Sequence, residues 1–133
     1  MAYWLLKSEP DSFSWADQVA RGALGEPWTG VRNHQAKNFL KQMAIGDLAF
    51  FYHTGDEKQI VGVVEVIKEA YPDPTDPAWF AVDVKARKAF NKPVSLATMK
   101  ADPALAELTL VKSPRLSVQP VSESHWHYLV GKG

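Results

Sequence analysis

Apolar residues occur in short runs along the chain, and the form of each run predicts a strand or a helix. Residues 3–7 are mostly apolar and predict a first strand, which ends before Pro10. Residues 48–53, 60–68 and 80–87 predict three more strands. Apolar side chains alternate in residues 80–87, as in a strand with one buried face, whereas residues 60–68 do not alternate. The second pattern predicts burial on both faces or a bulge.

Capping residues and apolar spacing predict two helices in the first part of the chain. Ser12 or Ser14 can cap a short helix that stops at Gly22. Asn33 is a good cap for a second helix, which Gly46 closes. The apolar residues of this second helix form one stripe: Ala36, Phe39, Leu40 and Met43.

The last third of the chain predicts two more helices and one strand. Ser95 and Ser122 precede segments that can form short helices, the second ending at Gly131. Residues 115–118 between them predict a final strand. Strands outnumber helices, and their spacing favours an α+β fold in which short helices flank a small closed or nearly closed sheet.

Three segments that connect the predicted strands and helices add detail to the expected fold. Residues 54–59 form a polar turn around Gly55, as a hairpin requires, so much of the sheet should be antiparallel. Residues 71–77 contain three prolines and predict an irregular connection. Residues 22–30 predict a loop, and Trp28 within it is a large aromatic residue where loops usually carry small polar ones. Trp28 is therefore a candidate for function.

The composition is that of one globular domain spanning residues 1–133. Hydrophobic residues make up 46% and charged residues 23%, which excludes a disordered chain. Cysteine is absent, so disulfides and thiolate metal sites are excluded, and we expect the reducing cytoplasm as the compartment. The apolar run at residues 3–6 is too short for a signal sequence or a membrane span.

The charges of the chain balance. There are 15 Lys and Arg and 15 Asp and Glu, so the formal net charge is zero. Long-range attraction to a polyanion is therefore modest, and nucleic-acid binding would need a local basic patch and a specific pocket. Arg32, Lys37 and Lys41 cluster about the second predicted helix and can contact phosphates. A solvated helix face explains these side chains about equally well.

The sequence offers little for catalysis. Among the histidines, His125 and His127 are two apart on a predicted helix, so they point in different directions and cannot share a metal ion. The other two, His34 and His53, can meet only through the fold, and no metal, phosphate-loop or nucleophile motif is present. A hydrolase that uses His53 and Glu65 is an alternative without a visible nucleophile or metal-bound water. We expect no enzyme activity, no metal and no cofactor.

Rigid aromatic residues beside amide, hydroxyl and guanidinium groups are the stronger signal. A base taken out of its stack is held between aromatic faces and by fixed donors and acceptors at its edge. Trp4, Trp15, Trp79 and Trp126 lie in predicted strands and helices and are expected in the core. Trp28 is the remaining tryptophan, which makes it the candidate for stacking on a base.

Five runs closely resemble the EVE domain family, and they occur in the order of that family over nearly the whole chain. They are residues 3–10 (YWLLKSEP), 28–40 (WTGVRNHQAKNFL), 46–53 (GDLAFFYH), 60–72 (IVGVVEVIKEAYP) and 115–122 (RLSVQPVS). The resemblance implies a PUA-like β-barrel of about five to six mostly antiparallel strands with flanking short helices, related to the YTH readers of methylated adenine. It also implies a non-enzymatic reader of a modified base, such as a 5-substituted cytosine, in DNA or RNA.

The resemblance further implies which residues surround the pocket. Its motif positions correspond here to Lys7, Ser8, Glu9, Trp28, Thr29, Arg32, Asn33, Tyr52, His53, Ser117 and Gln119. We expect Trp28 to stack on the base, Asn33, Ser8 and Gln119 to bond its edge, and Arg32 to meet a phosphate.

Three alternatives remain open at this point. Modified RNA, such as transfer RNA, is as well suited to such a pocket as modified DNA, and contact with the 2′-hydroxyl is what separates them. A small nucleotide-processing hydrolase is a second alternative, and a protein-interaction adaptor with an exposed aromatic patch is a third. We expect any effector proteins to be separate chains, and this chain to be a monomer or a weak dimer.

Overall fold

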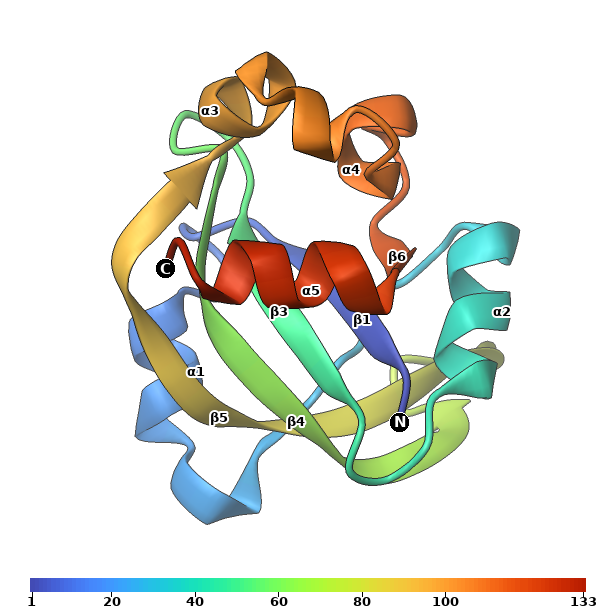
Figure 1. Cartoon of the computed structure of the whole chain (residues 1–133). Helices are drawn as coiled ribbons and strands as arrows, with labels where there is room; N and C mark the ends of the chain where they lie inside the picture. Colours follow the sequence, from blue (N-terminus) through green and yellow to red (C-terminus); the bar gives the residue numbers. More distant parts are fainter.

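The computed structural model describes residues 1–133 and contains a six-stranded sheet (Figure 1). The strands pair in the order β2-β5-β4-β3-β1-β6. Strand β1 is parallel to β3, and the other neighbouring pairs are antiparallel, which confirms the mostly antiparallel α+β fold. The strands are β1 (Tyr3–Ser8), β2 (Glu26–Pro27), β3 (Leu48–His53), β4 (Gln59–Asp73), β5 (Asp76–Ser95) and β6 (Val118–Val121).

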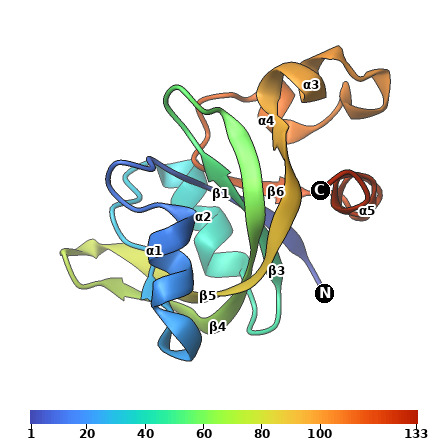
Figure 2. The ribbon, with the colours of Figure 1, turned by 90° about the vertical axis from the view of Figure 1, so that its left-hand side faces the viewer.

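Short helices cover both faces of this sheet. Helices α1 and α2 lie on one side, and α5 crosses the other side (Figure 2). The helices are α1 (Trp15–Ala20), η1 (Gly22–Leu24), α2 (His34–Gln42), α3 (Leu96–Ala101), η2 (Pro103–Leu105), α4 (Thr109–Lys112) and α5 (Glu123–Val130). None of them has the length and apolar character that a bilayer span requires.

The central strands bury side chains in two separate cores. Leu6 of β1 packs in the core beneath α2, together with Leu40 of that helix. Leu5, the preceding residue of the same strand, packs in the opposite core with Trp126 of α5. Strand β4 is buried on both faces near its start and also shifts register against β5, so both readings of residues 60–68 are confirmed.

The four predicted helix starts are confirmed by their caps. Each capping side chain accepts a hydrogen bond from the backbone N–H three residues later, which satisfies one of the free donors at a helix start. The capping residues are Ser14 for α1, Asn33 for α2, Ser95 for α3 and Ser122 for α5. Of the two serines considered for the first helix, Ser14 is the cap.

The prediction of an irregular connection at residues 71–77 is wrong. Strand β4 runs to Asp73 and β5 begins at Asp76, so this segment is the end of a long hairpin. Pro72 is paired with Phe80 there. Backbone hydrogen bonds from β4 to the chain that leads into β3 stop at Val66, so the edge of β4 opposite β5 has no partner strand at Pro72. Proline is tolerated at such an edge because no N–H is needed there.

Several other boundaries differ from the prediction, and one of them is the end of β5, which lies at Ser95 instead of residue 87. Helix α2 ends at Gln42, before Gly46, because the Asp47 carboxylate accepts a hydrogen bond from the Ala44 N–H and turns the chain toward β3. The final strand begins at Val118 instead of residue 115. Residues 22–30, predicted as a loop, include η1 and β2, and α4 was not predicted.

The sheet is strongly curved but is not closed by its edge strands. The long strands β4 and β5 bend across the molecule (Figure 1). The pairing order ends at β2 and β6, so hydrogen bonds between these two strands do not complete a ring. Both edge strands are short, as edge strands commonly are in natural sheets.

The close approach of Trp15 to β4 predicts that Gly62→Ala destabilises the fold. A Cβ at position 62 would lie 2.6 Å from the Trp15 ring, which also packs edge-on against Phe51. Displacing this ring should lower the free energy of unfolding by about 1–3 kcal/mol. Urea denaturation followed by tryptophan fluorescence measures the loss.

Gly131→Ala is the matched control. A Cβ there meets no atom closer than 3.5 Å, and the glycine has a φ of −65°, which alanine adopts readily. We expect its free energy of unfolding to stay within about 0.5 kcal/mol of the wild type. Equal stability of Gly62→Ala and Gly131→Ala would show that the packing of Trp15 does not require glycine at position 62.

Candidate functional site

A cavity opens where β1 ends and the chain turns toward α1. Its volume is about 430 Å³, within the usual range of small-ligand sites. Four segments contribute to it: the end of β1, the turn before α1, the residue that caps the end of α1, and the chain from β2 onward. The lining residues are Lys7, Ser8, Glu9, Ser12, Phe13, Arg21, Glu26, Pro27, Trp28 and Thr29.

The fold brings two of the predicted motif segments together in this cavity. Lys7, Ser8 and Glu9 lie on one side, and Trp28 and Thr29 lie on the other. Sequence reasoning missed the remaining lining residues, namely Ser12, Phe13, Arg21, Glu26 and Pro27. Their closeness in sequence to Glu9 or to Trp28 was the available signal.

Trp28 forms part of the cavity wall and part of the core. Its ring packs edge-on against Phe51 and Phe13, with ring centroids 5.5 and 6.3 Å apart. Only 7% of its surface is exposed, so its rim, more than its full face, is available to a ligand. The indole Nε1 has no hydrogen-bond partner and is not one of the fully buried polar atoms, so it remains a free donor.

Polar groups with unused hydrogen-bonding capacity surround the aromatic wall. The Ser8 hydroxyl donates to the Phe13 carbonyl oxygen, which leaves its own lone pairs free. Glu9 and Thr29 are exposed, and their side chains make no hydrogen bond within the protein. Arg21 and Glu26 form an ion pair with a 3.1 Å separation at the rim. The cavity thus offers free acceptors and donors beside aromatic carbon.

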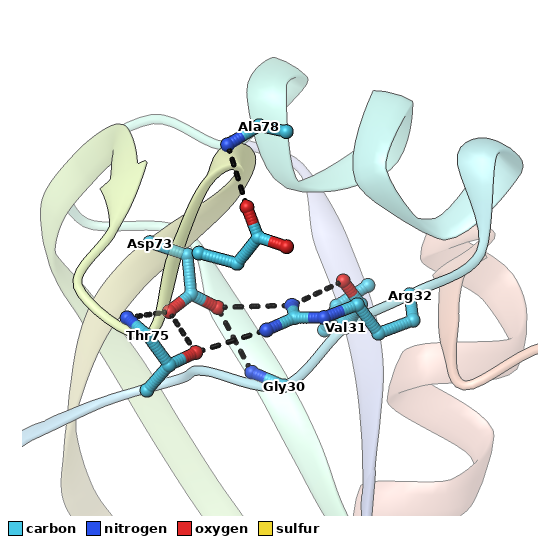
Figure 3. A network of polar contacts seen from close by, with 7 residues as sticks. Gly30, Val31, Arg32, Asp73, Thr75 and Ala78 are labelled. Carbon is cyan, nitrogen blue, oxygen red and sulfur yellow. Dashed lines mark hydrogen bonds and ion pairs between the residues drawn. The ribbon is translucent and has the colours of Figure 1, made fainter.

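A buried carboxylate anchors the segment that carries Trp28 and Thr29. Asp73 accepts hydrogen bonds from the Gly30 N–H at 3.0 Å and from the Arg32 Nη1 at 3.2 Å (Figure 3). It also accepts from the N–H and the hydroxyl of Thr75, at 2.7 and 2.6 Å. Burial by itself raises the pKa of Asp73, but these hydrogen bonds outweigh it and lower the pKa to about 2.

The same network decides the role of Arg32. Its guanidinium is bonded to Asp73, to the Thr75 hydroxyl and to the Val31 carbonyl oxygen. It also lies 5.7 Å from the centroid of the Trp79 ring. These contacts of Arg32 stabilise the segment that carries Trp28 and Thr29. Arg32 does not line the cavity, contrary to the prediction that it would meet a phosphate there.

The remaining predicted basic residues form a basic–aromatic strip with the β4–β5 hairpin. The Nζ atoms of Lys37 and Lys41 lie 5.4 Å and 5.0 Å from the Trp79 and Phe80 ring centroids. His34 packs on the same Trp79 ring, at 4.9 Å. His34 and Lys41 are exposed, whereas Lys37 and the two aromatic rings are half-buried, and none of these residues lines the cavity.

Other predicted residues also lie outside the cavity. The Asn33 side chain accepts a hydrogen bond from the Ala36 N–H and caps α2. Tyr52 is buried in the core beneath α5. Gln119 is fully buried, and its Nε2 donates to the carbonyl oxygens of Ser113 and Leu116. These three residues hold the scaffold around the cavity.

His53 fixes the start of α1 instead of facing the cavity. Its Nε2 accepts a hydrogen bond from the Trp15 N–H at 3.0 Å. The Nδ1 therefore carries the proton and donates to Glu57 at 2.8 Å, which lowers the pKa of that carboxyl. The last predicted residue, Ser117, accepts a hydrogen bond from the Lys7 N–H through its carbonyl oxygen.

The structure separates the pair of residues on which hydrolysis was considered. His53 is paired with Gln59 across the strands, whereas Glu65 is paired with Leu48 at the other end of β3. Five residues of extended strand, about 17 Å, separate the two positions. Glu65 instead forms an ion pair with Arg87. The two side chains do not share a site.

Comparison with known proteins shows which proteins the whole chain resembles. A model of the EVE domain matches residues 2–132. Thymocyte nuclear protein 1 of Mus musculus is 35% identical over 162 residues, covering 96% of this chain and 72% of that protein. The NMR structure of Rpa0253 from Rhodopseudomonas palustris is 53% identical with a TM-score of 0.95, covering 100% of this chain and 93% of that chain.

Two similar structures contain nucleic acid. Human THYN1, solved with DNA containing 5-methylcytosine, is 31% identical with a TM-score of 0.91, covering 99% of this chain and 97% of that chain. The YTH domain of MRB1 from Zygosaccharomyces rouxii, solved with N6-methyladenosine RNA, has a TM-score of 0.60 at 14% identity, covering 98% and 83%. The second likeness concerns the fold alone. Together these comparisons confirm the expected resemblance and the PUA-like fold.

The Asp73 network predicts an acid-sensitive part of the stability. The pKa of Asp73 is about 2 in the folded protein and 3.8 for an unperturbed carboxyl, a difference worth about 2 kcal/mol. This contribution is present above about pH 5 and is lost as the pH falls through 4 toward 2. Asp73→Asn should therefore unfold more easily at pH 7, and its difference from the wild type should shrink at pH 2. Urea denaturation across this pH range measures it.

Asp56→Asn is the control for this series. Asp56 lies in an exposed turn, and its carboxylate makes no hydrogen bond or ion pair within the protein. We expect this variant to follow the wild type at every pH. A constant difference between Asp73→Asn and the wild type from pH 7 to pH 2 would contradict the proposed ionisation.

Proposed function

The chain belongs to the EVE domain family, and from this membership and the geometry of the cavity we propose that it is a non-enzymatic reader of a modified nucleobase. The base occupies the cavity between the end of β1 and the segment Trp28–Thr29. A 5-substituted cytosine in DNA is the proposed ligand. A modified base in RNA, such as transfer RNA, is the alternative.

The single observation that carries this proposal is the composition of the cavity wall. Phe13 and Trp28 present aromatic carbon, while Glu9 and Thr29 present polar groups without partners in the protein. A base has an apolar ring face and a polar edge, so it can use both kinds of surface at once. A ligand that is wholly apolar would leave the carboxylate unpaired.

The chemistry of cytosine fits the free groups. Its exocyclic amine is a donor and can bond the Glu9 carboxylate. Its carbonyl and ring nitrogen are acceptors and can receive hydrogen bonds from the Thr29 hydroxyl or the Trp28 Nε1. A methyl group at the 5-position can lie against Phe13, where its burial contributes about 1 kcal/mol. Discrimination therefore combines one apolar contact with several hydrogen bonds.

The human relative supports this choice of ligand. Human THYN1 is solved in complex with DNA containing 5-methylcytosine, and its identity of 31% extends over almost the whole of both chains. We extend that ligand to this chain as a proposal. Contacts to the base edge and face do not distinguish DNA from RNA, because the distinguishing 2′-hydroxyl lies on the sugar.

The alternative functions have weaker support in the structure. His53 and Glu65 lie at opposite ends of β3 and cannot act together as a hydrolytic pair. An adaptor with an exposed aromatic patch is disfavoured because Trp4, Trp28 and Trp126 are buried. We propose a cytoplasmic monomer or weak dimer whose effector proteins are separate chains.

Glu9→Gln is predicted to weaken binding of the modified base. The change keeps the size of the side chain but removes the charged acceptor for the exocyclic amine, which should reduce affinity about tenfold or more. The measurement is fluorescence anisotropy with short DNA and RNA oligonucleotides that carry cytosine, 5-methylcytosine, adenine or N6-methyladenine. All are compared at one near-physiological salt concentration.

Asp11→Asn is the matched control, because this exposed carboxylate is two residues from Glu9 but does not line the cavity. It loses the same charge and should keep wild-type affinity and selectivity. Trp28→Phe tests the wall with less risk to the core than Trp28→Ala, since a buried Trp→Ala change costs about 3–5 kcal/mol of stability. Binding of the wild type without preference for any oligonucleotide would refute the reader.

A further inference from the structure

A second cavity lies beside the first, between the start of α2 and the loop that precedes β6. Its volume is about 410 Å³. It is lined by Asn33, Gln35, Ser113, Pro114, Arg115 and Leu116. Neither Asp nor Glu contributes to it, in contrast to the first cavity with Glu9 and Glu26. The second cavity therefore presents a positive charge that no lining carboxylate neutralises.

Arg115 is the source of that charge, and it is the one arginine without a carboxylate partner. Arg21 is paired with Glu26, Arg32 with Asp73, and Arg87 with Glu65. Arg115 is exposed and makes no ion pair or side-chain hydrogen bond. Its guanidinium keeps the planar set of donors that suits a phosphate group.

Lys7 and the segment between Thr29 and Asn33 connect the two cavities. Lys7 lines the first cavity, and its Nζ donates to the carbonyl oxygen of Pro114, which lines the second. Thr29 lines the first cavity and Asn33 the second, and four residues of chain span at most about 14 Å. The two cavities are thus close enough for neighbouring parts of one nucleic-acid strand.

Hydrogen bonds from a buried side chain fix the backbone of the loop that carries Arg115. The buried Gln119 donates hydrogen bonds to the carbonyl oxygens of Ser113, at 3.0 Å, and Leu116, at 2.8 Å. These bonds flank Pro114 and Arg115 on both sides. Binding at Arg115 therefore requires little ordering of the backbone, which favours affinity.

We propose that the second cavity binds the phosphodiester next to the base in the first cavity, and that Arg115 is its main cationic contact. This inference rests on the proposed function, because it takes the base as the occupant of the first cavity. It assigns the phosphate to Arg115 instead of Arg32, whose guanidinium is held by Asp73. It also predicts that the protein recognises a strand carrying the modified base better than the free nucleoside.

Arg115→Gln tests this assignment. We expect its affinity for a single-stranded hexanucleotide with one 5-methylcytosine to fall about tenfold. The slope of log affinity against log salt concentration should decrease by about 0.7, the value for one lost phosphate contact on a single strand. Affinity for 5-methyl-2′-deoxycytidine, measured by NMR titration, should not change. DNA and RNA hexanucleotides form separate arms, because both supply a phosphodiester.

Arg87→Gln is the matched control, since it makes the same chemical change at an exposed arginine that lines neither cavity. Equal affinities and salt slopes for Arg115→Gln and Arg87→Gln would overturn the phosphate assignment. If Glu9→Gln still weakens nucleoside binding in that case, the proposed function stands and only this inference fails. Absence of binding to the nucleoside and to every hexanucleotide would overturn both.

Discussion

Strands β1 and β3 bury side chains on both faces of the sheet, and this constraint decides where the other elements lie. Leu5 and Phe50 face the core beneath α5, whereas Leu6 and Phe51 face the core beneath α2. Because successive side chains of a strand point to opposite faces, each strand needs a cover on both sides. The helices supply these covers. Polar side chains of β1 reach water where this strand ends, so they are not penalised by full burial there. The first cavity forms at such an end, next to Ser8.

A second constraint holds the opposite wall of that cavity. The Asp73 carboxylate is fully buried, so leaving it without partners would be strongly unfavourable. Thr75, Gly30 and Arg32 supply the partners, and in doing so they fix the chain that carries Trp28 and Thr29. The arrangement also removes Arg32 from the set of free cations. A positively charged side chain near a pocket is thus not free to bind a ligand when it pairs with a buried carboxylate.

Features of this fold that depend on local sequence were predictable, and those that depend on distant partners were not. The caps Ser14, Asn33, Ser95 and Ser122 need only the next few residues, so the sequence was sufficient to place them. The β4–β5 hairpin was missed because three prolines suggested a loop. Whether a proline fits a strand depends on which edge is paired, and that is decided by β3.

The same distinction applies to the site. Two site segments were predicted because the resemblance covers both of them: Lys7 to Glu9, and Trp28 with Thr29. The structure brings these two segments together in the first cavity. Phe13 lies close to Glu9 in the sequence, which was an available signal, whereas the hydrogen bond between Gly30 and Asp73 joins residues 43 positions apart. No local pattern marks such contacts. The roles of Arg32 and Gln119 likewise depend on partners that only the fold reveals.

The balance of charges limits how this protein can recognise a nucleic acid. Three of its four arginines are bound to carboxylates, which leaves Arg115 and Lys7 as the cations at the two cavities without a carboxylate partner. Each phosphate contact contributes about 0.7–0.9 to the salt dependence of affinity, so the total electrostatic contribution is small. Non-specific binding along a nucleic acid should then be weak. Selectivity must arise mainly in the cavity, where the aromatic wall and the unpaired polar groups meet a single base.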